Sequence, residues 1–180
     1  MSNSITNDRV TGSAQLRMSN GLTSVLSDVL VIAASDKATT PWEKKLAYWL
    51  AQHDQSRTGL GCVGFDIEEL GWTREDFAAQ QRFLVDMIAA ALARYGWERL
   101  PFTPTDSVLG ALRSLHRLVM EFTPEHIRAL DERVWTPEDL PEQGLCEVHR
   151  VYLHETGCII CNDAPIDAPP ESTPNQTPEL

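Results

Sequence analysis

Apolar residues recur at helical spacing in the middle of the chain, and the first such stretch opens with a strong start signal. Thr40 can cap a helix, Pro41 fits its first position, and Glu43 stands three residues after the cap. The apolar positions that follow share one face: Trp42, Leu46, Trp49 and Leu50. The pattern predicts a helix that begins at residue 41 and ends by residue 56, before the glycine-rich turn at 58–61.

Two further stretches predict longer amphipathic helices. One covers about 77–95, with Thr73 and Asp76 as capping residues and Gly96 at the C-terminal cap. Another runs from residue 105 or 106 to 122. Thr-Pro-acid sequences at 123–125 and 136–139 predict a fourth, shorter helix to about residue 133 and one more helical turn.

Alternation of apolar and small or polar residues predicts extended structure in two places. Val63, Phe65 and Ile67 alternate with Gly64 and Asp66, and residues 97–102 are compatible with a brief strand. The expected fold class is therefore mainly α, a small helical bundle with two or three short strands.

Both ends of the chain differ in composition from this middle. We expect residues 1–40 to be a flexible N-terminal segment, with a short helix at 22–34 that docks loosely, and Met18 is an alternative start. We expect residues 41–163 to form the helical domain. Residues 164–180 combine five prolines with three acids and no base, which predicts a disordered acidic tail.

The charge balance restricts the possible partners. The chain has 26 acidic and 15 basic residues, a net charge of -11. Direct nucleic-acid binding is not expected, because phosphate contacts require clustered Lys and Arg. No apolar run approaches the roughly 20 residues of a membrane span, and no secretion signal is recognisable, so we expect a cytoplasmic protein. An acidic surface would suit a basic protein partner.

Three of the four cysteines lie between residues 146 and 161. Cys146 and His149 are separated by two residues, and so are Cys158 and Cys161, with Gly157 directly before the second pair. Two such pairs supply the four donors of a tetrahedral Zn²⁺ site. The segment resembles a zinc knuckle or a treble-clef-type hairpin, but no helix is expected after the second pair because the chain leads into the proline tail.

Other interpretations of these residues stay open. His154 is an alternative to His149 as the fourth ligand. Disulfides are disfavoured because one of the four cysteines, Cys62, is remote from the other three. A redox Cys-x2-Cys pair normally opens a helix within a βαβ unit, and no such unit is expected here. An iron–sulfur cluster would favour a fourth thiolate in place of a histidine. A catalytic zinc usually keeps three protein ligands and an open position, so a structural zinc is favoured.

These patterns favour a non-enzymatic, zinc-binding interaction or regulatory module, in its sharpest form an inhibitor or immunity-type protein for a basic partner. The alternative is a small metalloenzyme or thiol enzyme that uses an open zinc site or Cys62. His53, His116 and the five tryptophans are interpreted as packing residues.

Overall fold

The computed structural model describes residues 3–55, 61–127, 135 and 144–163. About half of these residues are helical, and the strands form two small sheets, so the expected mainly α class is confirmed. The helices are α1 (Asn20–Lys37), α2 (Pro41–Ala51), α3 (Phe77–Leu92), α4 (Ser107–Glu121) and the short α5 (Ile159–Asp163). In the described part of the chain, 3₁₀ turns cover Ile67–Glu69, Trp97–Arg99 and Pro124–His126.

Each sheet is a pair of two-residue antiparallel strands. β1 (Ser4–Ile5) pairs with β2 (Leu16–Arg17), and β3 (Asp54–Gln55) pairs with β4 (Gly61–Cys62). The extended segment predicted from residue 63 is not a named strand; its Asp66 forms an isolated parallel bridge with Thr6. The brief strand predicted at 97–102 is wrong, because a 3₁₀ turn begins there directly after Gly96, whose φ is 73°.

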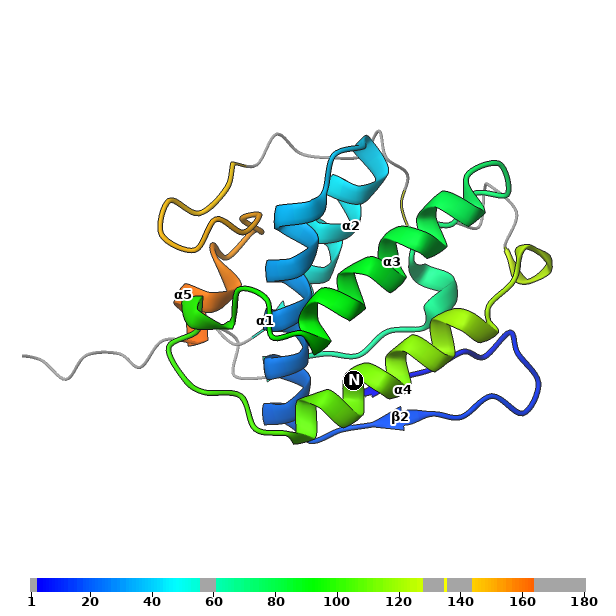
Figure 1. Ribbon diagram of the computed structural model, residues 1–180, viewed down its shortest axis with the longest axis horizontal. Coiled ribbons are helices and arrows are strands. Elements are labelled where there is room, and N and C mark those ends of the chain that lie inside the picture. Colours follow the sequence, from blue (N-terminus) through cyan, green and yellow to red (C-terminus); the bar gives the residue numbers. More distant parts are fainter. Residues whose placement is uncertain (1–2, 56–60, 128–134, 136–143, 164–180) are drawn as a thin grey trace, which may run out of the picture.

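The helix α1 is the centre of the fold (Figure 1) and packs against α2, α3 and α4. It includes the short helix expected at 22–34, but it is longer and does not dock loosely. Its residues Val29, Val31 and Ile32 are fully buried. The physical reason is that residues 29–34 of α1 are all apolar, so this part of the helix is apolar in every direction. That is the pattern of a buried helix, whereas a surface helix has a single apolar stripe. The core therefore begins before residue 40, where we had expected a flexible segment to end.

The helices predicted from amphipathic patterns are present with shifted ends. α2 has the full capping box: Thr40 Oγ1 accepts from the Glu43 amide at 3.3 Å, and Glu43 Oε2 accepts from the Thr40 amide at 2.9 Å. α3 ends three residues before the expected Tyr95, because Arg94 adopts a left-handed conformation with φ 62°. The predicted fourth helix is wrong at its start, because Pro124–His126 forms a 3₁₀ turn and Ile127 after it is extended, with φ -69° and ψ 128°. Its remaining residues 128–133, the turn at 136–139 and the tail at 164–180 lie outside the described residues.

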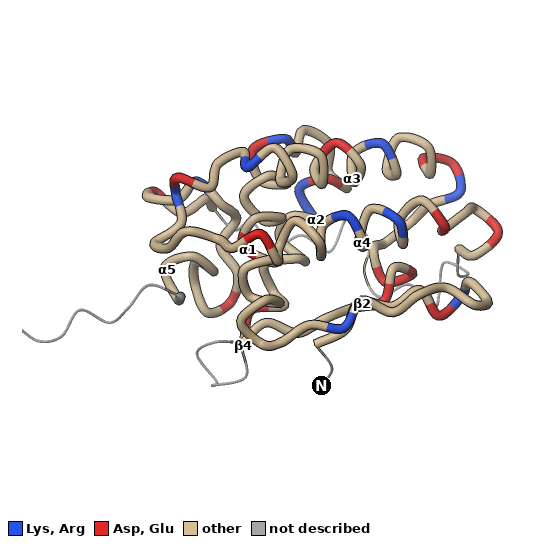
Figure 2. The backbone as a smooth tube through the Cα atoms, turned by 60° about the horizontal axis from the view of Figure 1, so that its bottom comes forward, with Lys and Arg blue, Asp and Glu red and all other residues tan. Residues whose placement is uncertain are grey.

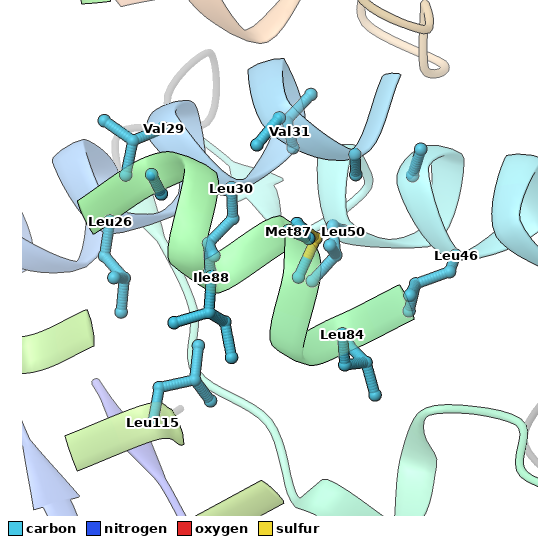
Figure 3. Close-up of a cluster of buried hydrophobic side chains, with 14 of the residues drawn as sticks. Leu26, Val29, Leu30, Val31, Leu46, Leu50, Leu84, Met87, Ile88 and Leu115 are labelled. Atoms are coloured by element: carbon cyan, nitrogen blue, oxygen red, sulfur yellow. The ribbon is translucent and has the colours of Figure 1, made fainter. Parts of the chain in front are cut away.

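The apolar faces of four helices meet in one core (Figure 3). Leu30 of α1 and Ile88 of α3 point toward Leu115 of α4, while Leu46 and Leu50 of α2 approach the other end of α3. Each of these side chains is at most 4% exposed, and burying one contributes about 1.5–3 kcal/mol. The core fixes α1, and α1 in turn supports the segment that carries the cysteines.

Candidate metal centre

The first Cys-x2-His pair is held in a tight turn between two bridged positions. Leu145 pairs antiparallel with Tyr152, and the Cys146 amide donates to the Val151 carbonyl at 2.8 Å. Within the turn, the Arg150 amide donates to the Cys146 carbonyl at 2.9 Å and the His149 amide donates to Cys146 Sγ at 3.4 Å. The turn therefore directs both the sulfur and the imidazole to its inner side.

The second pair follows a turn closed by His154 and Gly157, which exchange two backbone hydrogen bonds of 2.9 Å each. Gly157 has φ 111°, a conformation that side chains rarely adopt. Cys158 comes directly before α5, and Cys161 lies within α5. Our expectation that no helix accompanies this pair is wrong. Pro165 cannot prevent a helix that ends two residues earlier, and the Asn162 amide already bonds to the Cys158 carbonyl at 3.0 Å.

The two turns bring four donor atoms together. The ligand atoms of Cys146, His149, Cys158 and Cys161 all lie within 4.8 Å of one another. His149 Nδ1 lies 3.8 Å from Cys146 Sγ, 3.5 Å from Cys158 Sγ and 3.3 Å from Cys161 Sγ. Cys146 Sγ and Cys161 Sγ are 3.9 Å apart. These residues lie close enough to hold a metal ion, and they form the one such group in the described part of the chain.

The electrostatic environment of the thiols differs from one to the next. Burial raises the pKa of Cys158 to about 12, and hydrogen bonds with the neighbouring thiols add to this. Burial also raises the pKa of Cys161. At Cys146 burial acts in the same direction, but the amides of His149 and Val148 outweigh it, and the pKa of Cys146 is lowered. Crowded thiols resist joint ionisation, and a bound cation removes that resistance because it favours the thiolates.

His154, the alternative ligand, does not belong to this group. Its side chain is 2% exposed, and its Nε2 lies 3.3 Å from Asp54 Oδ2, at the start of β3. The same carboxylate oxygen accepts a hydrogen bond of 2.8 Å from Asn162 Nδ2 of α5. The hydrogen bond of Asn162 thus fastens the cysteine-bearing segment to β3, and the His154 ring lies beside the same carboxylate. Sequence reasoning missed Asp54, because nothing in the local pattern singles it out.

Arg99 and Ser35 make two further connections that the sequence did not indicate. Arg99 Nη1 donates to the carbonyl oxygen of His149 at 3.0 Å, and the guanidinium also pairs with Asp36 at the end of α1. The Tyr152 amide donates to Ser35 Oγ at 3.2 Å. In Figure 1 the segment 144–163, drawn in yellow to orange, accordingly lies beside α1 and the turn that follows α3.

Apolar contacts place the same segment in the core. Val151, Ile159 and Ile160 are fully buried, and Cys146 and Cys158 are 7% and 4% exposed. The cysteine-bearing segment is therefore packed against the helices as well as hydrogen-bonded to them.

Cys62, the reactive thiol of the alternative thiol-enzyme hypothesis, lies in an environment that suppresses its reactivity. It is fully buried beside α1, and burial, reinforced by the charges of Asp28 and Asp54, raises the pKa of its thiol to about 12. A thiol of this kind is neither ionised nor accessible near neutral pH.

The tryptophans and two histidines lie where packing residues lie. All five tryptophans are at most 8% exposed. Four of them form a chain of ring contacts of 6.2–6.3 Å, from Trp72 through Trp42 and Trp135 to Trp49. His53 packs on Trp49 at 4.2 Å, and His116 lies half-buried on α4.

Comparison with family models, with curated proteins and with solved structures gave no match to this chain. Among the described residues, no helix combines the length and the apolar character needed to cross a bilayer. The geometry of the cysteine–histidine cluster is therefore the feature of this chain that bears most directly on function.

Proposed function

We propose that Cys146, His149, Cys158 and Cys161 bind one Zn²⁺ in a closed structural site. The observation that carries this proposal is the spacing of the donor atoms. Zn–S bonds of about 2.3 Å and a Zn–N bond of about 2.0–2.1 Å in a tetrahedron imply S–S edges of about 3.8 Å and S–N edges of about 3.6 Å. The corresponding edges here are 3.9 Å for one sulfur pair and 3.3, 3.5 and 3.8 Å for the three S–N pairs.

The donor types favour zinc over other metals. Three thiolates and an imidazole are a soft set that suits Zn²⁺, whereas Mg²⁺ and Ca²⁺ prefer oxygen ligands. Iron–sulfur clusters are held mostly by four cysteines, and the remaining cysteine, Cys62, is buried beside α1 and is not one of the four clustered residues.

A structural role follows from the number of donors. Four protein ligands fill a tetrahedral site, whereas catalytic zinc sites keep one position for water or substrate. On this proposal residues 146–161 form a zinc-knuckle-like hairpin that closes into α5. The metal then fixes the segment against α1, next to the contacts made by Arg99 and Ser35.

The zinc content of the purified chain tests this function. The reduced protein should contain about one zinc per chain by elemental analysis and native mass spectrometry. Co²⁺ exchanged into the site should give thiolate charge-transfer bands and the intense visible bands of a tetrahedral complex. Cys158→Ser should lower the metal content, while Cys62→Ala, the matched control at a buried cysteine away from the cluster, should leave it unchanged. Metal-free protein, or weak octahedral cobalt bands, would refute the site.

We also infer that the protein is a non-enzymatic interaction module for a basic protein partner, for example an inhibitor of that partner. The net charge of -11 supports this, because it would steer a basic partner toward the surface. Figure 2 shows Asp and Glu on many elements, with Lys and Arg between them, so the support comes from the overall balance and not from one acidic face. Asp66 and Glu68 are engaged internally, with Thr6 and Arg9.

A rate measurement tests the partner proposal. Proteins captured from native lysate should include a basic chain whose association rate with the zinc-loaded protein falls at least about tenfold between low and physiological salt. A capture that yields only acidic or neutral chains, or a rate that salt does not change, would contradict it. Neither result bears on the zinc site, which has its own test.

A further inference from the structure

The three cysteines of the cluster differ sharply in their access to solvent. Cys146 and Cys158 are 7% and 4% exposed, whereas Cys161 is exposed. The cause is the helical geometry of α5. Ile159 and Ile160 turn into the core and are fully buried, so the next residue of the helix faces outward. A small reagent arriving from solvent meets the Cys161 sulfur first.

A second thiol lies within reach of Cys161. Cys146 Sγ is 3.9 Å away, and it comes from the first turn rather than from α5. A disulfide needs about 2.05 Å, so the two sulfurs must approach by about 2 Å. Both sulfurs also lie near His149 Nδ1, at 3.3 and 3.8 Å. The bond would therefore join two of the four donors across the site.

We propose that Cys161 is the thiol of this centre that a peroxide oxidises, and that the disulfide it then forms with Cys146 releases the metal. This inference rests on the proposed zinc binding and assigns a regulation to the same site. Its two determinants are the exposure of Cys161 and the 3.9 Å separation of its sulfur from Cys146.

The chemistry balances with hydrogen peroxide as the oxidant. The Cys161 thiolate attacks one peroxide oxygen, the O–O bond breaks, and sulfenic acid and hydroxide form. The Cys146 thiolate then attacks the sulfenic sulfur, the S–O bond breaks, and a second hydroxide leaves as the disulfide forms. The two sulfurs lose two electrons to the peroxide, and two protons from solvent convert both hydroxides to water. Only Cys158 and His149 are left as donors, too few for a stable structural site.

The helical core is expected to survive this oxidation. The contacts of α1 with α2, α3 and α4 do not involve the cysteine-bearing segment, and Arg99 still bonds to the carbonyl of His149. The oxidised protein should therefore lose its metal without losing the helices α1 to α4, and a thiol reductant with added zinc should restore it. This reversibility separates a switch from oxidative damage.

The test uses the full-length, reduced, zinc-loaded chain with hydrogen peroxide as the probe. A chromogenic chelator follows zinc release, and differential alkylation with mass spectrometry identifies the disulfide. Cys161→His keeps four zinc-competent donors but lacks the exposed thiol, so its zinc release should be at least about tenfold slower. Cys62→Ala is the matched control and should release zinc at the wild-type rate, because Cys62 is buried outside the cluster.

The outcomes distinguish this inference from the zinc proposal. A Cys146–Cys161 disulfide that appears together with zinc release supports the inference. A Cys158–Cys161 disulfide, or zinc that stays bound after excess peroxide, would overturn it and leave the zinc site intact. Disulfide mapping needs only the wild-type chain, so the inference stays testable if Cys161→His fails to fold. A reduced protein without zinc refutes the zinc proposal before peroxide is added.

Discussion

Replacing Arg99 tests whether the helical body positions the metal ligands. Its guanidinium connects three parts of the chain: the 3₁₀ turn after α3, Asp36 at the end of α1, and the carbonyl of His149 at 3.0 Å. The Arg99 side chain is 19% exposed, so water screens these interactions only in part. Arg99→Ala removes the donor that holds the backbone of the proposed imidazole ligand.

The size of the effect follows from the hydrogen bond to His149. Hydrogen bonds to charged groups contribute about 1.5–3 kcal/mol, and partial exposure puts this one at the lower end. A loss of about 1.4 kcal/mol corresponds to a tenfold change in a dissociation constant. We therefore expect Arg99→Ala to weaken zinc binding about tenfold. In the wild type Arg99 holds the His149 backbone in place before the metal binds, whereas in the variant His149 must be ordered at the expense of the binding free energy.

Competition with a chromogenic chelator measures this constant, and Asp36→Ala provides the control. Asp36→Ala removes the ion pair, which at such exposure contributes about 0.2–1 kcal/mol, but it leaves the bond from Arg99 to His149 in place. Its zinc affinity should therefore stay within about fivefold of wild type. Unchanged affinity in Arg99→Ala, or an equal loss in both variants, would refute the argument that Arg99 acts through the His149 carbonyl.

Three further predictions address stability. Removing zinc with a chelator should lower the free energy of unfolding by about 2.7 kcal/mol relative to protein with free zinc at 100 times its dissociation constant. The loss should be measurable as a drop in melting temperature, and an unchanged melting temperature would contradict the proposed zinc site. Gly71→Ala should lower the free energy of unfolding in urea by about 2–4 kcal/mol, because φ of Gly71 is +67° and the new Cβ would lie 2.6 Å from the Trp135 ring. Wild-type stability of this variant would show that the close contact does not form. Burial lowers the pKa of His53 in the folded protein, so on acidification the unfolded state takes up this proton at a higher pH than the folded state. The free energy of unfolding should therefore fall as pH drops below the ordinary pKa of 6.5 and recover as pH rises. A His53→Gln variant with the same dependence of stability on pH would show that His53 is not its cause.

The sequence predicted α2, α3 and α4 because each has one apolar face, and a single face leaves a periodic signal. It underestimated α1 for the opposite reason. Residues 29–34 of α1 are all apolar and buried, so this part of the helix lacks the alternation of polar and apolar faces that marks a surface helix. The ends of the helices were less predictable, since the left-handed conformation at Arg94 depends on the packing that follows α3.

The cysteine–histidine cluster was predictable because each half of it is local. Two residues between ligands suffice to turn a pair of donors toward one point, so the spacing itself carries the information. The groups that hold the cluster in place carry no such signal. Arg99 is 50 residues from His149, Ser35 is 117 residues from Tyr152, and Asp54 is 108 residues from Asn162. Such contacts arise only once the helices have packed.

The structure also changes how the metal relates to the fold. The spacing of the ligand pairs carries no information on packing, yet Ile159 and Ile160 lie fully buried between the proposed ligands Cys158 and Cys161. A helix as short as α5 is not stable by itself, so its order depends on these apolar contacts and on the proposed metal together. Each favours the other: burial of the two isoleucines places both sulfurs, and the sulfurs bound to a metal keep the isoleucines in the core. Loss of either should therefore loosen α5 first, while α1 keeps its contacts with α2, α3 and α4.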